Sequence, residues 1–181
     1  MEKFTSVSSF IQWVQVQKRF SKKVSLDKMR FFCQTLGNPQ NQFKSIHITG
    51  TNGKGSTVAM LTTILMNHGY HVGMYTSPYI QSFNERISYD FKPIDDTSLL
   101  YFANQIIEKY DFFEEKGYEM PTFFEFITLL AFLYFANQKE MDYAIIEVGM
   151  GGRLDSTNVI TPILSIVTNV ALDHMAILGN T

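Results

Sequence analysis

Residues 43–57 read Phe43-Lys44-Ser45-Ile46-His47-Ile48-Thr49-Gly50-Thr51-Asn52-Gly53-Lys54-Gly55-Ser56-Thr57. Their first half predicts a strand that runs into a glycine-bearing turn. A helix is predicted over residues 56–68, closed by Gly69, and a second strand over residues 71–76. One stripe of that helix carries Val58, Leu61, Ile64, Leu65 and His68. This order of strand, turn, helix and strand is a βαβ unit, which favours a parallel sheet.

The other segments also alternate between helices and strands. Residues 142–148 and 163–168 are unbroken apolar runs, which predict strands covered by helices on both faces. Helices are predicted over residues 6–20, 26–36, 97–113 and 122–137. The last of these opens with the Thr122–Glu125 spacing of a capping box, and residues 77–93 are predicted to form a long irregular loop. The sequence therefore predicts an α/β fold: a three-layer, open, mostly parallel sheet with a phosphate-binding loop.

Composition excludes several classes of protein. Hydrophobic residues make up 45% and charged residues 18%, with 11 Gly and 5 Pro, which excludes collagen-like, low-complexity and disordered chains. The formal net charge of -2 lacks the basic footprint of a nucleic-acid-binding protein, so a bound anion must be held by local geometry. The single cysteine, Cys33, cannot form an internal disulfide and is interpreted as a small buried hydrophobic residue.

The sequence shows neither a secretory signal nor an apolar segment long enough to span a membrane. The N-terminus has no basic stretch leading into an apolar run, so it does not resemble a secretory signal. The longest apolar run, residues 126–136, would span about 16 Å as a helix, well short of the ~30 Å of a bilayer core. We therefore expect a cytoplasmic protein without a membrane partner.

The turn after the first strand has the features of a phosphate-binding loop. Its glycines allow positive φ, so that successive backbone amides face one anion, and the following helix adds its free amides. Lys54 adds a charge for the outer phosphates, and Ser56 or Thr57 can cap the helix and reach a metal. The generic pattern G-x-x-x-x-G-K-[ST] does not match, because Ile48 and Gly55 stand at two of its fixed positions. The alternative is an ordinary glycine-rich turn with an exposed lysine.

Two more polar residues lie at or near predicted strand ends, where open α/β sheets bind ligands. Glu147 closes a strand ahead of a glycine cluster, where an acidic residue would hold Mg²⁺ directly or through water; alternatively it is a helix-capping or solvated side chain. His174 follows the last strand and is either a ligand or a hydrogen-bonded surface residue. Arg86, within the predicted loop of residues 77–93, suits a bidentate clamp on an anionic substrate, unless Glu85 and Arg86 are two neighbouring charges on a solvated loop.

Taken in order, these segments resemble the family of folylpolyglutamate and dihydrofolate synthases, which are Mur-type ATP-dependent amide ligases. The motifs that carry the resemblance are Leu36-Gly37-Asn38-Pro39, residues 50–57, Thr76-Ser77-Pro78, Asn84-Glu85-Arg86-Ile87, residues 122–125, residues 147–158 and Leu172-Asp173-His174. Gly-Thr-Asn-Gly-Lys-Gly-Ser is the family's own phosphate loop, which accounts for the mismatch with the generic pattern.

The resemblance implies an enzyme of folate metabolism. ATP would phosphorylate the carboxylate of a pteroate or a folate, and the amine of L-glutamate would then displace phosphate. Mg²⁺, lysine and backbone amides would spread the charge of the transferring phosphoryl group, so no side-chain nucleophile is needed. The implied partners are the small molecules ATP, L-glutamate and a folate or pteroate, with no nucleic acid and no membrane, and the full-length protein is expected to be a monomer.

The resemblance also implies roles for particular residues. The ATP phosphates would contact Thr51, Asn52, Gly53, Lys54, Gly55 and Ser56. The magnesium ligands would be Ser77, Glu147 and His174, and the catalytic residues Lys54, Glu147 and His174. Arg86 would face the folate, and the pterin side would contact Thr122, Phe123, Phe124, Glu125, Leu154, Asp155 and Ser156.

The sequence departs from the family pattern at two places, and it is shorter than the members of the family. Tyr79 stands where the family usually has a histidine, and residues 22–25 do not reproduce the family's early pteroate-binding stretch, so the fine substrate preference stays open. Family members are more than twice as long. We therefore expect residues 1–181 to form an incomplete N-terminal ATP-binding domain of the Mur ligase central type, without the C-terminal glutamate-ligase domain and inactive alone.

Three alternatives stay open. A peptidoglycan-type Mur ligase is disfavoured by Gly55, where those enzymes usually have Ser or Thr, and by residues 122–125. A non-catalytic nucleotide-binding module is favoured by the missing second domain. A GTPase or small-molecule kinase would need base-recognition or acceptor motifs that the sequence does not show.

Overall fold

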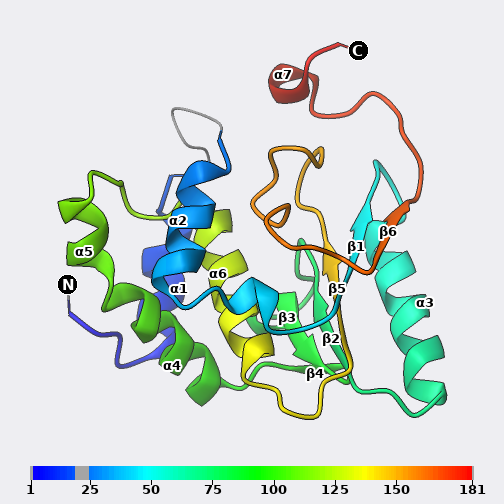
Figure 1. The fold of residues 1–181 in the computed structure, drawn as a ribbon, viewed down its shortest axis with the longest axis horizontal. Coiled ribbons are helices and arrows are strands. Elements are labelled where there is room, and N and C mark those ends of the chain that lie inside the picture. Colours follow the sequence, from blue (N-terminus) through cyan, green and yellow to red (C-terminus); the bar gives the residue numbers. More distant parts are fainter. Residues whose placement is uncertain (1, 19–24, 181) are drawn as a thin grey trace.

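A six-stranded sheet organises the computed structural model, which describes residues 2–18 and 25–180 (Figure 1). Its strands are β1 (Ser45–Thr49), β2 (Val72–Tyr75), β3 (Ile87–Tyr89), β4 (Lys92–Pro93), β5 (Tyr143–Glu147) and β6 (Leu164–Val167). The spatial order is β4-β3-β2-β5-β1-β6, with β2, β5, β1 and β6 parallel and β3 and β4 antiparallel. The prediction of an open, mostly parallel α/β sheet is confirmed.

The register of the parallel strands sets which residues meet at their carboxyl ends. Ile48 of β1 pairs with Glu147 of β5, and Tyr75 of β2 pairs with Ile146. The chain therefore leaves β1, β2 and β5 at the same level, and the turns that follow these strands share one edge of the sheet.

Helices cover the two faces of the sheet unequally. The helices are α1 (Val7–Gln15), α2 (Asp27–Thr35), α3 (Lys54–Asn67), α4 (Asp96–Ile107), α5 (Tyr110–Glu115), α6 (Phe123–Ala136) and α7 (Met175–Leu178), with short 3₁₀ helices η1 (Pro39–Asn41) and η2 (Phe83–Arg86). In Figure 1, α3 stands on one side of the sheet, while α6 and the remaining longer helices stand on the other. The α6 side chains are buried nearly all round, because this helix lies between the sheet and α1, α2 and α4.

Two expected helices have different bounds in the structure. The helix expected over residues 6–20 ends at Gln15, and residue 20 lies outside the described residues. The helix expected over residues 97–113 is two helices, α4 and α5, separated by Glu108 and Lys109. The break brings Phe113 against Phe32, with ring centres 4.5 Å apart, so tertiary packing sets a boundary that no glycine or proline marks.

The predictions for residues 56–68 and 77–93 also need correction. The first helix begins at Lys54, two residues earlier than predicted, and it buries Thr62 while leaving Ile64 exposed. Residues 77–93 are not an irregular loop throughout, since they contain η2 and the β3–β4 hairpin. These elements have two to four residues each, too short to give a recognisable hydrophobic period.

The expectation that helices cover both faces of residues 163–168 is wrong. β6 is the edge strand of the sheet, and Leu164 and Val167 are about half exposed. An apolar run is expected for a doubly covered strand, but it does not distinguish that case from an edge strand.

The structure bears on the environment of Cys33 and on the length of the apolar helices. Cys33 is fully buried, and burial raises the pKa of its thiol to about 12, as expected for an unreactive core residue. In the described part of the chain, no helix combines the length and apolarity that a bilayer span requires.

His71 links the starts of β2 and β5 to the β3–β4 turn and gives a pH-dependent contribution to stability. Its Nδ1 lies 2.7 Å from Asp90 Oδ2, and its backbone N–H donates to Asp142 Oδ2 at 2.8 Å. The hydrogen bond with Asp90 raises the pKa of His71. The contribution is therefore fully present below the unfolded pKa of about 6.5 and is lost as pH rises through the higher folded pKa.

We expect His71→Gln to lower the free energy of unfolding at pH 5.5 and to have a smaller effect at pH 8.5, as measured by urea denaturation. His68→Gln is the matched control, because the Nδ1 of His68 contacts the helix carbonyl of Ile64 and, among the described residues, no carboxylate. An equal effect of His71→Gln at both pH values would contradict the assignment.

Candidate functional site

The turn between β1 and α3 exposes an unsatisfied helix N-terminus. Gly53 is the N-cap residue, with φ of 81°, and it has no side chain to cap the helix. Within the described part of the chain, the backbone N–H groups of residues 54–56 have no hydrogen-bond acceptor. These amides stand at the positive end of a 14-residue helix, which is the arrangement that binds phosphate groups.

The hydroxyl groups at the start of α3 do not cap it. Because the helix begins at Lys54, Ser56 lies inside the first turn, and Thr57 Oγ1 donates to the Gly53 carbonyl at 2.8 Å. The prediction that Ser56 or Thr57 caps the helix is therefore wrong. Lys54 Nζ donates to the carbonyl oxygens of Gly50 and Thr51, at 2.8 and 3.2 Å, so its charge lies over the turn.

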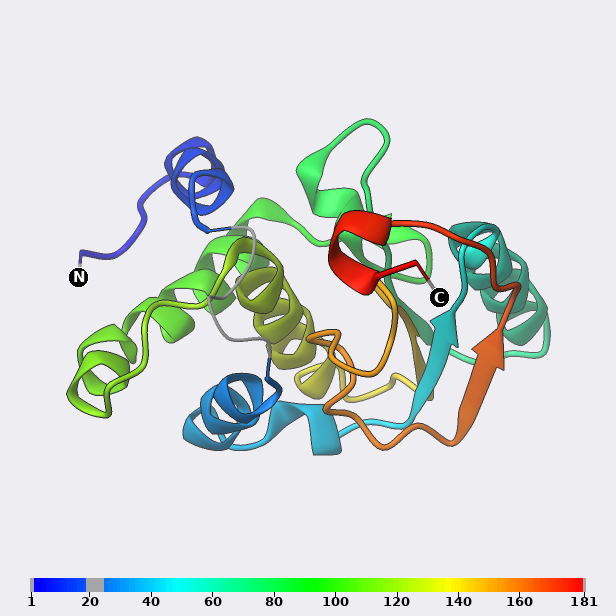
Figure 2. The same ribbon diagram turned by 90° about the horizontal axis from the view of Figure 1, so that it is seen from above.

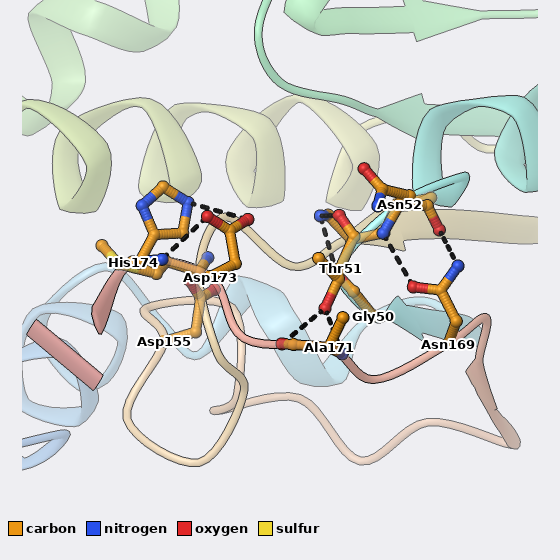
Figure 3. A network of polar contacts seen from close by, with 10 residues as sticks. Gly50, Thr51, Asn52, Asp155, Asn169, Ala171, Asp173 and His174 are labelled. Carbon is orange, nitrogen blue, oxygen red and sulfur yellow. Dashed lines mark hydrogen bonds and ion pairs between the residues drawn. The ribbon is translucent and has the colours of Figure 1, made fainter. Parts of the chain in front are cut away.

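Residues 168–171, which follow β6, form hydrogen bonds with residues 51 and 52 of the turn between β1 and α3, which we call the phosphate loop (residues 50–56). The N–H groups of Thr51 and Asn52 donate to the main-chain oxygen and Oδ1 of Asn169, at 2.9 and 3.0 Å. Asn169 Nδ2 returns a bond to the Asn52 carbonyl at 3.2 Å (Figure 3). Gly50 packs so closely against Thr168 and Asn169 that a Cβ at this position would lie 2.9 Å from the Asn169 carbonyl oxygen. Asn169 was missed as a site residue, although its place directly after an apolar strand is a usable signal.

A cavity of about 560 Å³ opens between this loop, residues 149–151 and the segment after β6. Its lining includes Thr49, Gly50, Lys54, Gly149, Asp173 and His174. Figures 1 and 2 show α7 beyond the carboxyl ends of the strands, above the same edge. Sequence segments separated by about a hundred residues therefore meet around the phosphate loop.

Glu147 lies beside the phosphate loop as a buried carboxylate. It is 4% exposed, and its Oε2 accepts the Ser77 N–H at 3.1 Å. A Cβ at Gly55 would lie 3.7 Å from the same oxygen. Burial raises the pKa of Glu147, although the Ser77 amide and the charge of Lys54 act in the opposite direction. In the described part of the chain Glu147 has no ion pair, so its burial is costly unless a cation joins it.

His174 lies after β6, in the lining of the cavity that Lys54 and Gly149 also line. It precedes α7 in a left-handed conformation, and its Nε2 lies 3.7 Å from Asp173 Oδ2 (Figure 3). Among the described residues, no hydrogen bond or ion pair joins His174 to Glu147 or Ser77, and no group of three His, Cys, Asp or Glu side chains is arranged for a metal. Of the three residues expected as magnesium ligands, Ser77 and Glu147 are joined by the hydrogen bond from the Ser77 main-chain N–H.

Arg86 lies inside the protein, 9% exposed, so it is not the solvated charge of the alternative interpretation. Its guanidinium carbon lies 5.0 Å from the ring centre of Tyr79, 5.3 Å from that of Phe123 and 5.8 Å from that of Phe83. Within the described residues its buried Nε has no hydrogen-bond partner. Burial lowers the pKa of the guanidinium group. A buried cation stacked on aromatic rings and lacking an acceptor is suited to binding an anion.

At the start of α6, Thr122 and Glu125 cap the helix, while Phe124 packs against the loop that follows β5. The predicted capping box is confirmed: Thr122 N–H donates to Glu125 Oε2 at 2.7 Å, and the Thr122 hydroxyl accepts from the Glu125 N–H. Lys28 Nζ lies 3.0 Å from the same Glu125 oxygen. Phe124 packs against Gly149, so closely that Gly149 has no room for a Cβ.

The loop of residues 149–158 holds the other expected substrate contacts. Leu154 is half exposed and Ser156 is partly buried. Asp155 is buried, and its carboxylate accepts the N–H groups of Met150 and Thr157, at 2.9 and 3.0 Å. The early stretch at residues 22–25, noted for its departure from the family pattern, lies outside the described residues except for Ser25.

Comparison with known proteins agrees with this geometry. Residues 48–181 match the Mur ligase middle domain. The chain is 43% identical over 178 residues to a dihydrofolate synthase/folylpolyglutamate synthase of Bacillus subtilis, covering 98% of this chain and 41% of that protein. It therefore spans about two fifths of the length of that relative.

Solved structures show the same fold. An FPGS–AMPPCP–folate complex aligns with a TM-score of 0.88 and 42% identity, over 98% of this chain and 43% of that one. A folylpolyglutamate synthase of Mycobacterium tuberculosis complexed with ADP aligns with a TM-score of 0.86 and 34% identity, over 96% of this chain and 38% of that one.

The raised pKa of Glu147 gives a prediction about stability. Its contribution is greatest below the unfolded pKa of about 4.3 and is lost as pH rises through the higher folded pKa. We expect Glu147→Gln to raise Tm at pH 7 without ligand by about 2–4 °C, the shift for about 1 kcal/mol in a chain of this size. The difference should vanish near pH 4 in differential scanning calorimetry.

Glu115→Gln, a change of the same kind on the surface, is the control and should leave Tm nearly unchanged at both pH values. A ligand-free Glu147→Gln variant that is less stable than wild type at pH 7 would refute the argument.

Proposed function

This chain belongs to the Mur ligase family, and from that premise we propose that it forms the ATP-binding part of a ligase that adds L-glutamate to a folate or dihydropteroate. The observation that carries the proposal is the unsatisfied N-terminus of α3 beside the buried pair Glu147 and Ser77. The match to a relative solved with AMPPCP and folate supports the same substrates here. We further propose that the protein acts as a cytoplasmic monomer.

The proposed reaction has two steps. A carboxylate oxygen of the acceptor attacks the γ-phosphorus of ATP, and ADP leaves, giving an acyl phosphate. The amine of L-glutamate then attacks the acyl carbon, inorganic phosphate leaves, and the nitrogen loses a proton. Since no protein nucleophile takes part, the protein's role is to position the reactants and to stabilise negative charge.

The phosphate loop would provide that stabilisation. The free amides of residues 54–56 would donate to phosphate oxygens. Lys54 would exchange its bonds to the Gly50 and Thr51 carbonyls for a charge-assisted bond to the outer phosphates. Thr51 and Asn52 would act mainly through loop shape, because their amides already donate to Asn169.

Glu147 and Ser77 suit a magnesium site. The carboxylate is buried, accepts one hydrogen bond, and lies next to the Ser77 main chain, so a hard cation would find an oxygen ligand and would offset a buried charge. Magnesium, when bound, would neutralise phosphate charge during transfer. We propose His174, which lines the same cavity as Lys54, as a third ligand.

The acceptor would lie between Arg86 and loop 149–158. A carboxylate or acyl phosphate would supply the anion that the Arg86 guanidinium lacks. The rings around Arg86 and the exposed Leu154 would offer apolar surface to the pterin side, with Ser156 near it. Thr122, Phe123, Phe124 and Glu125 would then shape this pocket from the start of α6, with Asp155 supporting the loop.

ATP-dependent glutamate addition is the direct test. ADP release by the complete gene product should require dihydropteroate or tetrahydrofolate together with L-glutamate, whereas residues 1–181 alone should bind ATP without turnover. Lys54→Met should weaken ATP binding about 10- to 100-fold, the effect of losing a hydrogen bond to a charged group. Binding is measured by isothermal titration calorimetry with Mg²⁺ present.

Lys44→Met is the control, because Lys44 directly precedes the opposite end of β1 and lies 5.9 Å from the Tyr143 ring centre. A wild-type protein that binds ATP but releases ADP with no acceptor would instead support a nucleotide-binding module. A preference for GTP over ATP, or for a UDP-muramoyl acceptor over a folate or dihydropteroate, would contradict the proposed substrates.

Arg86 gives a separate prediction about the acceptor. Arg86→Lys keeps the charge but removes the planar fork, so KM for the acceptor should rise about tenfold or more while KM for ATP stays within about twofold. Arg30→Lys, an exposed arginine paired with Asp27, should change neither constant. An unchanged acceptor KM in Arg86→Lys would remove Arg86 from the substrate site.

A further inference from the structure

A buried chain of three polar side chains connects β1 to loop 149–158. His47 of β1 is 8% exposed, and its Nε2 lies 2.8 Å from Thr157 Oγ1. The Thr157 hydroxyl in turn lies 2.5 Å from Asp155 Oδ1. The strand neighbours Ile46 and Ile48 pack on the α3 face, so His47 faces the opposite side of the sheet.

The chemistry of the three groups fixes the direction of these hydrogen bonds. The Thr157 hydroxyl donates to Asp155 Oδ1. The Thr157 oxygen is then left to accept, and the donor is the Nε2–H of His47. Burial lowers the pKa of His47, which favours its neutral form. His47 therefore serves as a neutral donor that anchors Thr157 to β1.

The same chain anchors both ends of loop 149–158. Asp155 accepts the Met150 N–H near the start of the loop and the Thr157 N–H near its end. A second link to β1 runs from Thr49 Oγ1 to the Gly151 carbonyl at 2.9 Å. Leu154, which is half exposed, and Ser156, which is partly buried, lie between these anchors, and both keep accessible surface for a ligand.

We propose that His47 is a positioning residue, which acts through Thr157 and Asp155 to hold loop 149–158 in the shape that presents Leu154 and Ser156 to the folate or pteroate acceptor. The inference rests on the proposed function, because it concerns the acceptor side of that site. His47 touches no reacting group. Its loss should therefore weaken acceptor binding and leave the handling of ATP intact.

Steady-state kinetics of the complete gene product test the inference. His47→Leu removes the donor at similar size, and we expect the acceptor KM to rise about tenfold while kcat and the KM for ATP stay within about twofold. His47→Gln keeps an N–H near the Nε2 position and should restore an acceptor KM close to wild type. Thr157→Val should match His47→Leu, and the double variant should be no worse than either, because both changes break one chain.

Ile48→Val is the matched control, since it creates a small defect in the same strand without touching the chain. It should lower Tm and leave the acceptor KM unchanged. Hydrogen exchange gives a second readout: the Met150 and Thr157 amides should exchange faster in His47→Leu and at the wild-type rate in Ile48→Val.

Each other outcome has a defined meaning. An active His47→Leu with unchanged acceptor KM and exchange rates would overturn the inference, as would a His47→Gln variant as defective as His47→Leu. Equal losses for ATP and acceptor would indicate general disruption and would also overturn it. A wild-type protein with no acceptor-dependent ADP release would overturn the proposed function, and with it the acceptor role, while the exchange rates would still decide whether His47 anchors the loop.

Discussion

The parallel pairing of β5 with β1 on one side and β2 on the other is the constraint on which the site depends. It fixes the level at which three strands end, and so it sets the phosphate loop, Glu147 and Ser77 side by side. A shift of β5 by one residue would turn Glu147 to the other face of the sheet. Ala144, Ile145 and Ile146 are fully buried, and such a shift would exchange side chains of different size between closely packed positions.

The parts of this arrangement that follow from local sequence were predictable. Unbroken apolar runs marked two of the four parallel strands, the order of strand, turn, helix and strand marked the other two, and glycines with a lysine marked the phosphate loop. These signals depend on neighbouring residues only. The Thr122–Glu125 capping box was predictable for the same reason. Local sequence patterns were therefore sufficient to predict the class of fold and the position of the phosphate loop.

The features that the sequence did not predict depend on contacts between distant segments. Arg86 is buried because Tyr79, Phe83 and Phe123 close around it, and nothing in its own neighbourhood distinguishes it from a solvated arginine. The α4–α5 break and the bonds of Asn169 to the phosphate loop have the same origin. Similarly, the exposure of β6 follows from its position at the edge of the sheet, since its sequence resembles that of a central strand.

Two buried charges of opposite sign connect stability to ligand binding. Glu147 and Arg86 are each less than a tenth exposed, and in the described part of the chain neither has an ion-pair partner. The loop that contacts Glu147 through the Ser77 amide also contacts Arg86, because the Thr76 N–H donates to the Arg86 carbonyl oxygen at 3.0 Å. Buried charges without partners destabilise a fold. Replacement of either by an apolar residue would remove that cost, so their presence supports the proposal that a cation binds at the carboxylate and an anion at the guanidinium group.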